Sequence, residues 1–233
     1  MTFLARTIRE ILRTEKKPGA LKGDWSTDWN RHHPEPSSHE FVEFWQTDDL
    51  RNIVPPSNEM PAGYDETAFL RRLSPVLGAD SVVEIGCGYG RLAPAFSRNC
   101  YLGLDINPKA IGKARKLLPD YRFDVIGFAG PYPEADLYLA YTVFLHVDDK
   151  HMVEIARDLS KACRKLLIVE ILDPSFRQAP SAVPNFVRSR MDYERTFDAF
   201  KLEFELRRPY AHYPGTDLSY LLLKRKESDQ NGP

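Results

Sequence analysis

The sequence predicts an α/β protein built on a doubly wound sheet, and three observations lead to that class. Short apolar runs alternate with amphipathic stretches between about residues 64 and 171, a pattern typical of parallel strands joined by helices. The first apolar run leads directly into a glycine-rich turn at residues 81–91. The length of 233 residues suits one domain with an appendage. We expect an N-terminal helix and cap at 1–63, a main domain at 64–225 and a disordered tail at 226–233.

Composition narrows the class of partner and the cellular location. The formal net charge of −1 implies no general attraction to nucleic acid or to a membrane. Cys87, Cys100 and Cys163 lie within apolar patterns, which favours reduced thiols over a disulfide framework. The chain has no apolar run near the ~20 residues of a membrane span and no secretory signal. We therefore expect a cytoplasmic protein.

The first 63 residues divide into a helical part and an irregular part. Residues 1–17 form a basic amphipathic pattern with Ile8 and Ile11 on its apolar face. Such a helix can contact a membrane or an acidic partner weakly, but we expect it to pack on its own domain. Residues 20–63 are rich in proline and tryptophan and lack a period, which predicts a loop docked on an apolar surface. His32, His33 and His39 make a poor zinc pattern, and we expect no metal.

The main domain is predicted to begin with a helix at 64–77 and a strand from residue 81. Gly86, Gly88 and Gly90 follow this strand, and glycines at alternate positions allow a sharp turn and close approach of a ligand to the backbone. A helix is expected from about 91 to 98. A strand, a glycine turn and a helix N-terminus together form a nucleotide-sized pocket with free N–H groups.

Two acids narrow the choice of nucleotide. Asp105 ends the second predicted strand, residues 101–106, where a carboxylate can accept both hydroxyls of a ribose. Glu84 stands two residues before the first glycine, where it would repel a pyrophosphate and suit a cationic group. Because the glycine spacing also departs from G-x-G-x-x-G, an NAD-linked oxidoreductase is disfavoured.

The remaining elements follow from periodicity and helix-start signals. Asn107 and Pro108 predict an N-cap and the first residue of a helix that runs to Pro119. An amphipathic helix is expected at 148–162 and a short one at 185–191. The further strands are expected at 121–123, running on into Asp124 and Val125, then at 135–141, 165–171, 201–208 and 218–223, the last two as an antiparallel pair.

The residues Glu84-Ile-Gly-Cys-Gly-Tyr-Gly90, followed by Asp105, resemble two motifs of the class I S-adenosylmethionine-dependent methyltransferases. Those motifs are (D/E)-x-G-x-G-x-G and an acid that closes the second strand. The resemblance covers residues 81–171 well and 200–223 loosely, and it does not cover 1–60. It implies a Rossmann-like sheet of seven strands in the order 3-2-1-4-5-7-6, with strand seven antiparallel and helices on both faces. It also implies S-adenosylmethionine as cofactor.

The resemblance assigns the cofactor site residue by residue. Asp124 would meet the adenine amino group, Val125 would cover the ring, and Cys87 is interpreted as a packing residue within the turn. The segment before the glycine turn often caps the cofactor in this family. The positions implied to contact the cofactor are Glu84, Gly86, Cys87, Gly88, Gly90, Asp105, Ile106, Asp124, Val125 and Tyr141.

The implied reaction is a direct displacement of an activated methyl group, which requires the acceptor to be held in line. A hydroxyl acceptor usually needs a base, and His146, just past the fourth strand, is the best candidate. Histidine at this place is also common in the family for structural hydrogen bonds. Glu170, Asp173 and Tyr193 are weaker candidates.

The acceptor is narrowed by two missing signatures. The fourth strand is followed by Ala140-Tyr141-Thr142-Val143, not by (D/N)-P-P-(Y/F), and no Asp-Asn pair follows the fifth strand. Methyltransferases of exocyclic nitrogens and magnesium-dependent catechol enzymes are therefore disfavoured. We expect methyl transfer to an oxygen or nitrogen of a small molecule. The alternatives are a catalytically silent binding module and an enzyme that acts on a macromolecule.

Overall fold

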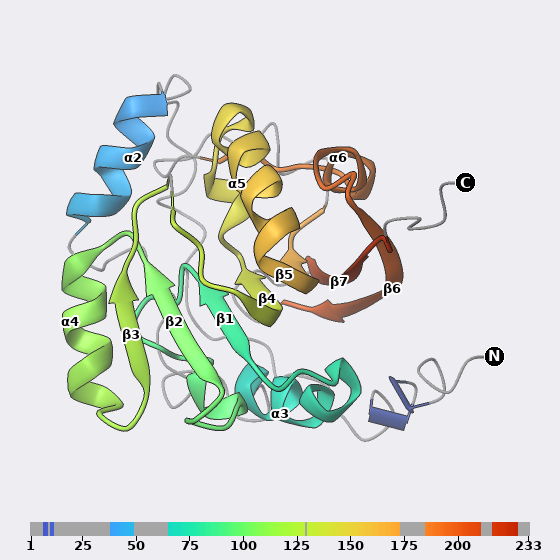
Figure 1. The fold of residues 1–233 in the computed structure, drawn as a ribbon, viewed down its shortest axis with the longest axis horizontal. Coiled ribbons are helices and arrows are strands. Elements are labelled where there is room, and N and C mark those ends of the chain that lie inside the picture. The colour runs from blue at the N-terminus through green and yellow to red at the C-terminus, as the bar shows by residue number, and fades with distance from the viewer. Residues whose placement is uncertain are drawn as a thin grey trace, which may run out of the picture.

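The computed structural model describes residues 7–8, 10–11, 38–48, 65–128, 130–172, 185–210 and 216–227. A seven-stranded sheet in the order β3-β2-β1-β4-β5-β7-β6 forms its centre (Figure 1). Strands β1 to β5 are parallel, and β7 lies antiparallel between β5 and β6. The predicted fold class and strand order are therefore confirmed. The strands are β1 Val82–Ile85, β2 Tyr101–Asp105, β3 Arg122–Val125, β4 Ala135–Tyr141, β5 Cys163–Glu170, β6 Phe200–Pro209 and β7 Asp217–Arg225.

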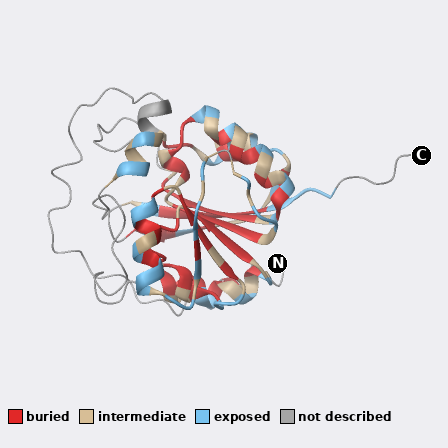
Figure 2. Ribbon diagram, turned by 60° about the vertical axis from the view of Figure 1, so that its left-hand side comes forward, coloured by how far each residue is buried: buried red, intermediate tan, exposed pale blue. Residues whose placement is uncertain are grey.

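Helices cover both faces of the sheet, and the residues of its central strands are mostly buried (Figure 2). Helices α3 (Glu66–Leu77) and α4 (Pro108–Leu117) contribute to the core on one face, and α5 (Asp149–Ala162) and α6 (Arg190–Thr196) to the core on the other. Successive residues of β4 alternate between the two cores: Leu139 faces the first, and Tyr138 and Ala140 face the second. Each fully buried leucine or phenylalanine contributes about 2 kcal/mol.

Short polar side chains fix the helix starts where the sequence predicts them. Asp65 accepts a hydrogen bond from the backbone N–H of Ala68 at the start of α3. Asn107 accepts from the N–H groups of Lys109 and Ala110, with Pro108 as the first residue of α4. Asp148 accepts from the N–H of His151 at the start of α5. These caps satisfy N–H groups that a helix leaves free.

The helix expected at 91–98 is wrong. Only a 3-10 turn, η2 (Ala93–Ala95), follows the glycine turn. Pro94 has no N–H and cannot donate into a longer α-helix, and β2 already begins at Tyr101. The short helix expected at 185–191 lies later, as α6, because Ser189 and Asp192 form a capping box that starts it at Arg190.

Parts of the first 63 residues are described. Ile8 is buried in the same core as α3, and Ile11 packs against it, so this face rests on the domain. The loop predicted for residues 20–63 is wrong at 38–47, where helix α2 (Ser38–Thr47) forms and lies near the carboxyl ends of β2 and β3 (Figure 1). The expectations for the side chains of His32, His33 and His39, for Asp173 and for the tail from residue 228 fall outside the described residues. Where the structure describes helices, each falls short of the length and apolarity of a membrane span.

Candidate functional site

The glycine turn after β1 adopts backbone conformations that side chains disfavour. Gly86, Gly88 and Gly90 have φ values of 66°, 55° and 76°, in the left-handed region that glycine occupies without strain. A Cβ added to Gly86 would come within 2.4 Å of Cγ2 of Val143. The turn therefore packs directly against the segment that follows β4.

Asp105 ties the glycine turn to the end of β2. Its Oδ2 accepts a hydrogen bond of 2.8 Å from the N–H of Gly88, and its Oδ1 accepts one of 2.8 Å from the N–H of Asn107. Burial raises the pKa of the Asp105 carboxyl, and these N–H groups oppose the rise. Because each carboxylate oxygen has a second lone pair, Asp105 can still accept hydrogen bonds from a ligand.

Glu84 points into the domain. It is buried in β1, and the hydroxyl of Tyr101 donates to its Oε2 at 2.5 Å. Burial raises the pKa of Glu84 to about 8, with the nearby charge of Asp105 adding to the effect and the Tyr101 hydrogen bond opposing it. The partner that the structure gives Glu84 is thus a tyrosine of the core, and its contact with the cofactor stays a prediction.

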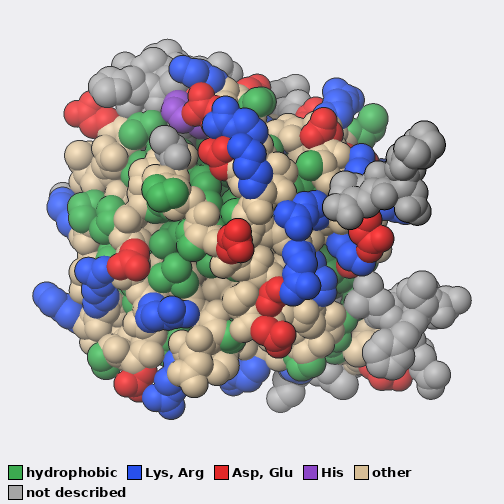
Figure 3. Space-filling view, viewed as in Figure 1, with side chains coloured by type: hydrophobic (Ala, Val, Ile, Leu, Met, Phe, Trp, Pro, Cys, Tyr) green, Lys and Arg blue, Asp and Glu red, His purple; other side chains and the backbone are tan. Residues whose placement is uncertain are grey.

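Apolar side chains adjoin Asp105 at the strand ends. Val125 pairs with Asp105 in the register of β2 and β3 and is 51% exposed. Ile106 follows Asp105 and is half-buried. Figure 3 shows apolar side chains at the surface over this part of the sheet. The carboxylate of Asp124 turns to α4, where Arg115 binds it at 2.7 Å, so its contact with adenine also stays a prediction.

Two further residues that were predicted to contact the cofactor, Tyr141 and Cys87, are buried. Tyr141 ends β4, and its hydroxyl is hydrogen-bonded to that of Tyr220 at 3.0 Å. The guanidinium of Arg91 lies 5.3 Å from the centre of the Tyr141 ring. Cys87 is buried, and burial raises the pKa of its thiol well above the usual value. A buried neutral thiol agrees with the interpretation of Cys87 as a packing residue.

His146 lies just beyond β4, at the end of the 3-10 turn η3 (Phe144–His146). Its ring packs on Trp45 of α2, with 4.7 Å between the ring centres. The side-chain amide of Asn107 donates to the backbone carbonyls of Trp45 and Asp48, both at 3.0 Å. Helix α2 is therefore anchored two residues after Asp105 and covers His146.

The other candidate bases differ in their surroundings. Glu170 ends β5, is fully buried and accepts three backbone N–H groups from the segment after β4. Burial raises the pKa of Glu170 to about 8, against the opposing effect of these N–H groups. Tyr193 is buried in the core on the α5 side.

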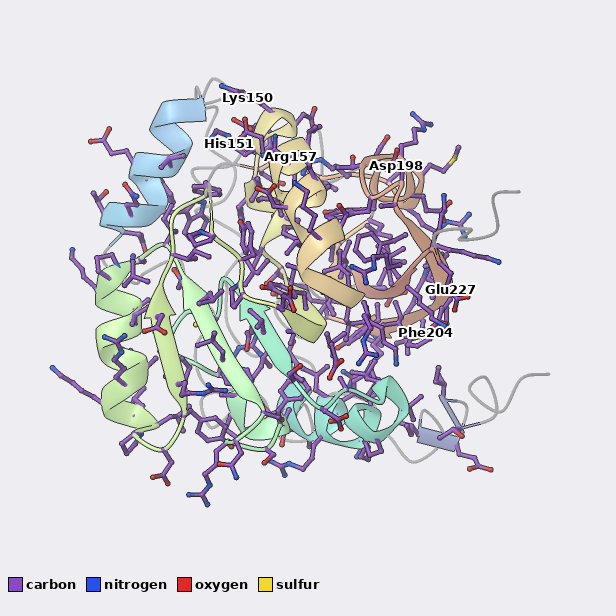
Figure 4. All side chains as sticks on the ribbon, viewed as in Figure 1. Lys150, His151, Arg157, Asp198, Phe204 and Glu227 are labelled. Carbon is purple, nitrogen blue, oxygen red and sulfur yellow. The ribbon has the colours of Figure 1, made fainter. Side chains whose placement is uncertain are left out.

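Sequence reasoning missed two features of this end of the domain. One is the second role of Asn107, which caps α4 and also holds α2. The other is His151, which pairs with Asp148 at 2.8 Å and lies 5.3 Å from the ring of Phe128. Figure 4 shows His151 at the end of α5 that faces α2. A histidine three residues after an acidic N-cap was the available signal for the second feature.

Residues 82–165 match the family model of a methyltransferase domain. This part of the chain is a methyltransferase domain, and the sheet has the strand order of the class I methyltransferase fold. A search among curated protein sequences gives no match. Solved structures share the fold of this methyltransferase domain at low sequence identity. The N-methyltransferase NodS from Bradyrhizobium japonicum, in complex with S-adenosylhomocysteine, is 17% identical with a TM-score of 0.59, covering 82% of this chain and 100% of that one.

Two other structures show the same methyltransferase fold. Magnesium protoporphyrin IX methyltransferase from Synechocystis, with bound S-adenosylhomocysteine, is 16% identical with a TM-score of 0.55, over 68% of this chain and 81% of that one. A TehB-like methyltransferase from Corynebacterium glutamicum is 19% identical with a TM-score of 0.53, over 71% and 91%. S-adenosylmethionine is the cofactor of such a domain.

The described residues fit this cofactor. The backbone of the glycine turn stays bare because of its positive φ values. Asp105 retains lone pairs for ribose hydroxyls, and exposed Val125 offers an apolar surface for the adenine ring.

The buried carboxyl of Glu84 predicts a pH dependence of stability. Its folded pKa of about 8 exceeds the ordinary value of 4.5, so the folded state binds this proton more tightly than the unfolded state. The contribution to stability is full below about pH 4.5 and is lost as pH rises through about 8, at a slope of about 1 kcal/mol per pH unit. We expect the free energy of unfolding of Glu84→Gln, measured in urea, to change less between pH 5 and pH 8 than that of the unaltered protein.

The matched control is Asp120→Asn, at an exposed surface acid. It should keep the slope of the unaltered protein, and Glu170 contributes equally to all three proteins. Equal slopes in the Glu84 variant and the control would contradict the assignment.

Proposed function

We propose that this protein transfers the methyl group of S-adenosylmethionine to an oxygen, or a nitrogen, of a small-molecule acceptor, with His146 as general base toward an oxygen. The observation that carries the proposal is the position of His146. It follows β4 in the segment that packs on the glycine turn, and Trp45 of α2 covers its ring. The proposed base thus belongs to the segment that packs on the cofactor turn, and a helix that can exclude water lies against its ring.

The proposal gives a role to each of four residues: Asp105, Ile106, Val125 and His146. When bound, S-adenosylmethionine supplies an activated methyl group on a sulfonium. Asp105 accepts hydrogen bonds from the ribose, and Val125 and Ile106 cover the adenine. His146 takes the proton of the acceptor hydroxyl as the oxygen lone pair forms its bond to the methyl carbon, while the carbon–sulfur electrons return to sulfur. Histidine is the side chain that most often serves as a general base.

Several features support a small-molecule acceptor. The net charge of −1 gives no general attraction to nucleic acid. Aromatic side chains lie against both histidines of this region: Trp45 packs on His146, and Phe128 packs on His151. A neighbour of the same fold is named as a methyltransferase of magnesium protoporphyrin IX. Nitrogen stays in the proposal because another neighbour is named an N-methyltransferase. We also propose a cytoplasmic location, on the basis of the reduced cysteines.

Two alternative functions predict a different pattern of S-adenosylhomocysteine release. A silent binding module would bind the cofactor without forming S-adenosylhomocysteine under any condition. An enzyme that acts on a macromolecule would turn over with the protein or nucleic-acid fraction of an extract and not with its small-molecule fraction. Measuring S-adenosylhomocysteine release with each fraction therefore separates all three functions.

We expect Asp105→Ala to weaken binding of S-adenosylhomocysteine, measured by calorimetry. The variant loses a charged acceptor for the ribose hydroxyls, at about 1.5–3 kcal/mol for each hydrogen bond. It also frees the N–H of Gly88, which loosens the turn. Asp120→Asn, at an exposed acid, serves as the control. Unchanged affinity in Asp105→Ala would rule out this cofactor site.

His146→Asn should lower turnover by a factor of about 10²–10⁴, the usual loss when a general base is removed. Affinity for S-adenosylhomocysteine and the melting temperature should stay nearly unchanged. Turnover is measured with the small-molecule fraction that supports the unaltered protein. His151→Asn, at the histidine that pairs with Asp148, should keep its turnover. If His146→Asn loses turnover only in step with its folding, the base lies elsewhere.

We further propose that α2 is a lid, and Asn107 allows a direct test. Asn107→Asp keeps the oxygen that caps α4 but removes the N–H donors to Trp45 and Asp48. We expect faster hydrogen exchange in residues 42–48 and a loss of stability, because a buried carboxyl oxygen then faces two carbonyl oxygens. Asn107→Ala should show the same faster exchange and also lose about 1 kcal/mol with the cap. Exchange in 42–48 that is equal in all three proteins would show that Asn107 does not anchor α2.

A further inference from the structure

The chain leaves the sheet abruptly after β4. Thr142 has a φ of 51°, an uncommon value for a residue that is not glycine. Its N–H donates to the carbonyl of Val169 at 2.8 Å. Beyond Thr142 the N–H groups have turned away from the neighbouring strand, and they need acceptors from elsewhere because unpaired buried N–H groups are costly.

Glu170 supplies that acceptor. It is the last residue of β5 and is fully buried. Its Oε1 accepts hydrogen bonds from the N–H groups of Val143, Phe144 and Leu145, at 2.9, 2.7 and 3.3 Å. When the Glu170 carboxyl is ionised, its hydrogen bonds are stronger than those between neutral groups. One side chain of β5 therefore holds three consecutive residues of the segment after β4.

Arg188 holds the same segment through its carbonyl groups. It is buried at 4% exposure and donates to the carbonyls of Phe144 at 2.8 Å and Val147 at 2.7 Å. The carboxylate of Asp149 binds the guanidinium from outside at 2.6 Å. A carboxylate on the N–H side and a guanidinium on the C=O side leave residues 143–147 little freedom to shift. We call Glu170 and Arg188 the brace.

The braced segment touches both parts of the proposed site. Val143 is the residue that a Cβ on Gly86 would strike at 2.4 Å, so its side chain packs directly on the glycine turn. His146, three residues later, packs on Trp45. A shift of the segment would therefore move the wall of the cofactor turn and the proposed base together.

We propose that Glu170, acting with Arg188, is a positioning residue that sets residues 143–147 against the cofactor turn and places His146 for methyl transfer. Burying a carboxyl group lowers the stability of the fold, and the Oε2 of Glu170 has no hydrogen-bond partner among the described residues. A role in positioning the segment explains why such a group stands here better than a role in stability does. The consequence for His146 rests on the proposed function, whereas the consequence for the cofactor turn does not.

Glu170→Gln and Glu170→Ala test the brace in steps. Glutamine keeps an oxygen in place for the three N–H groups but cannot ionise, and alanine removes the acceptor. By NMR, hydrogen exchange at Val143, Phe144 and Leu145 should rise about tenfold in the alanine variant and by less in the glutamine variant. The dissociation constant of S-adenosylhomocysteine should rise in the same order. Exchange in the middle of β4 should not change.

Two comparisons keep the result interpretable. Asp136→Asn alters another carboxylate that accepts backbone N–H groups, those of Asp80 and Ser81 at the opposite end of the sheet, and it should leave both readouts unchanged. Arg188→Lys reaches the same segment without altering β5, and it should raise exchange at Val147 and weaken S-adenosylhomocysteine binding even where Glu170→Ala fails to fold.

Unchanged exchange at residues 143–145 in Glu170→Ala would overturn the brace, and so would unchanged exchange at Val147 together with unchanged S-adenosylhomocysteine affinity in Arg188→Lys. An equal rise throughout β4 and β5 would overturn it as well, because that pattern reports general stability. If the unaltered protein does not bind S-adenosylhomocysteine, the proposed function fails, and the exchange result still decides on the brace.

Discussion

The carboxylate of Asp105 is the interaction on which the rest of the site depends. One of its oxygens holds the N–H of Gly88 in the turn after β1, and the other holds the N–H of Asn107 at the start of α4. Asn107 in turn binds two carbonyls at the end of α2. A single acid at the end of β2 therefore connects the glycine turn, a sheet-covering helix and the helix that covers His146. Hydrogen bonds to an ionised group are strong enough for this purpose, and burial keeps them from competition with water.

Glu170, at the end of β5, has a similar role for the segment after β4. Asp105 organises the turn after β1, and Glu170 organises the segment after β4, two loops that meet where Val143 packs on Gly86. In each case a strand-end carboxylate accepts backbone N–H groups that the sheet itself cannot satisfy. Each loop is thus held by its own carboxyl group, and the two loops pack against each other. This arrangement suits a reaction in which acceptor and methyl group must be held in line.

The parts of this structure that could be predicted from sequence are those with local signals. Apolar runs marked the strands, and Asn107 with Pro108 marked the start of α4. The strand order came from the resemblance carried by the glycine turn and Asp105. The helix expected after Gly90 was wrong because Pro94 and the early start of β2 shorten it. The pairing of Glu84 with Tyr101 and the three N–H groups on Glu170 join residues far apart in the chain. No periodicity or spacing reports such contacts, so they emerge only from the fold.

The central claim is that the carboxyl ends of the central strands bind S-adenosylmethionine around Asp105. An NMR titration of the unaltered protein with S-adenosylhomocysteine tests it most directly. The account predicts saturable shifts of the backbone amides in residues 86–90, 105–107 and 143–145, with no shift at Asp80, Ser81 or Asp136 at the opposite end of the sheet. A titration without saturable shifts, or one whose shifts gather at that opposite end, would contradict the account.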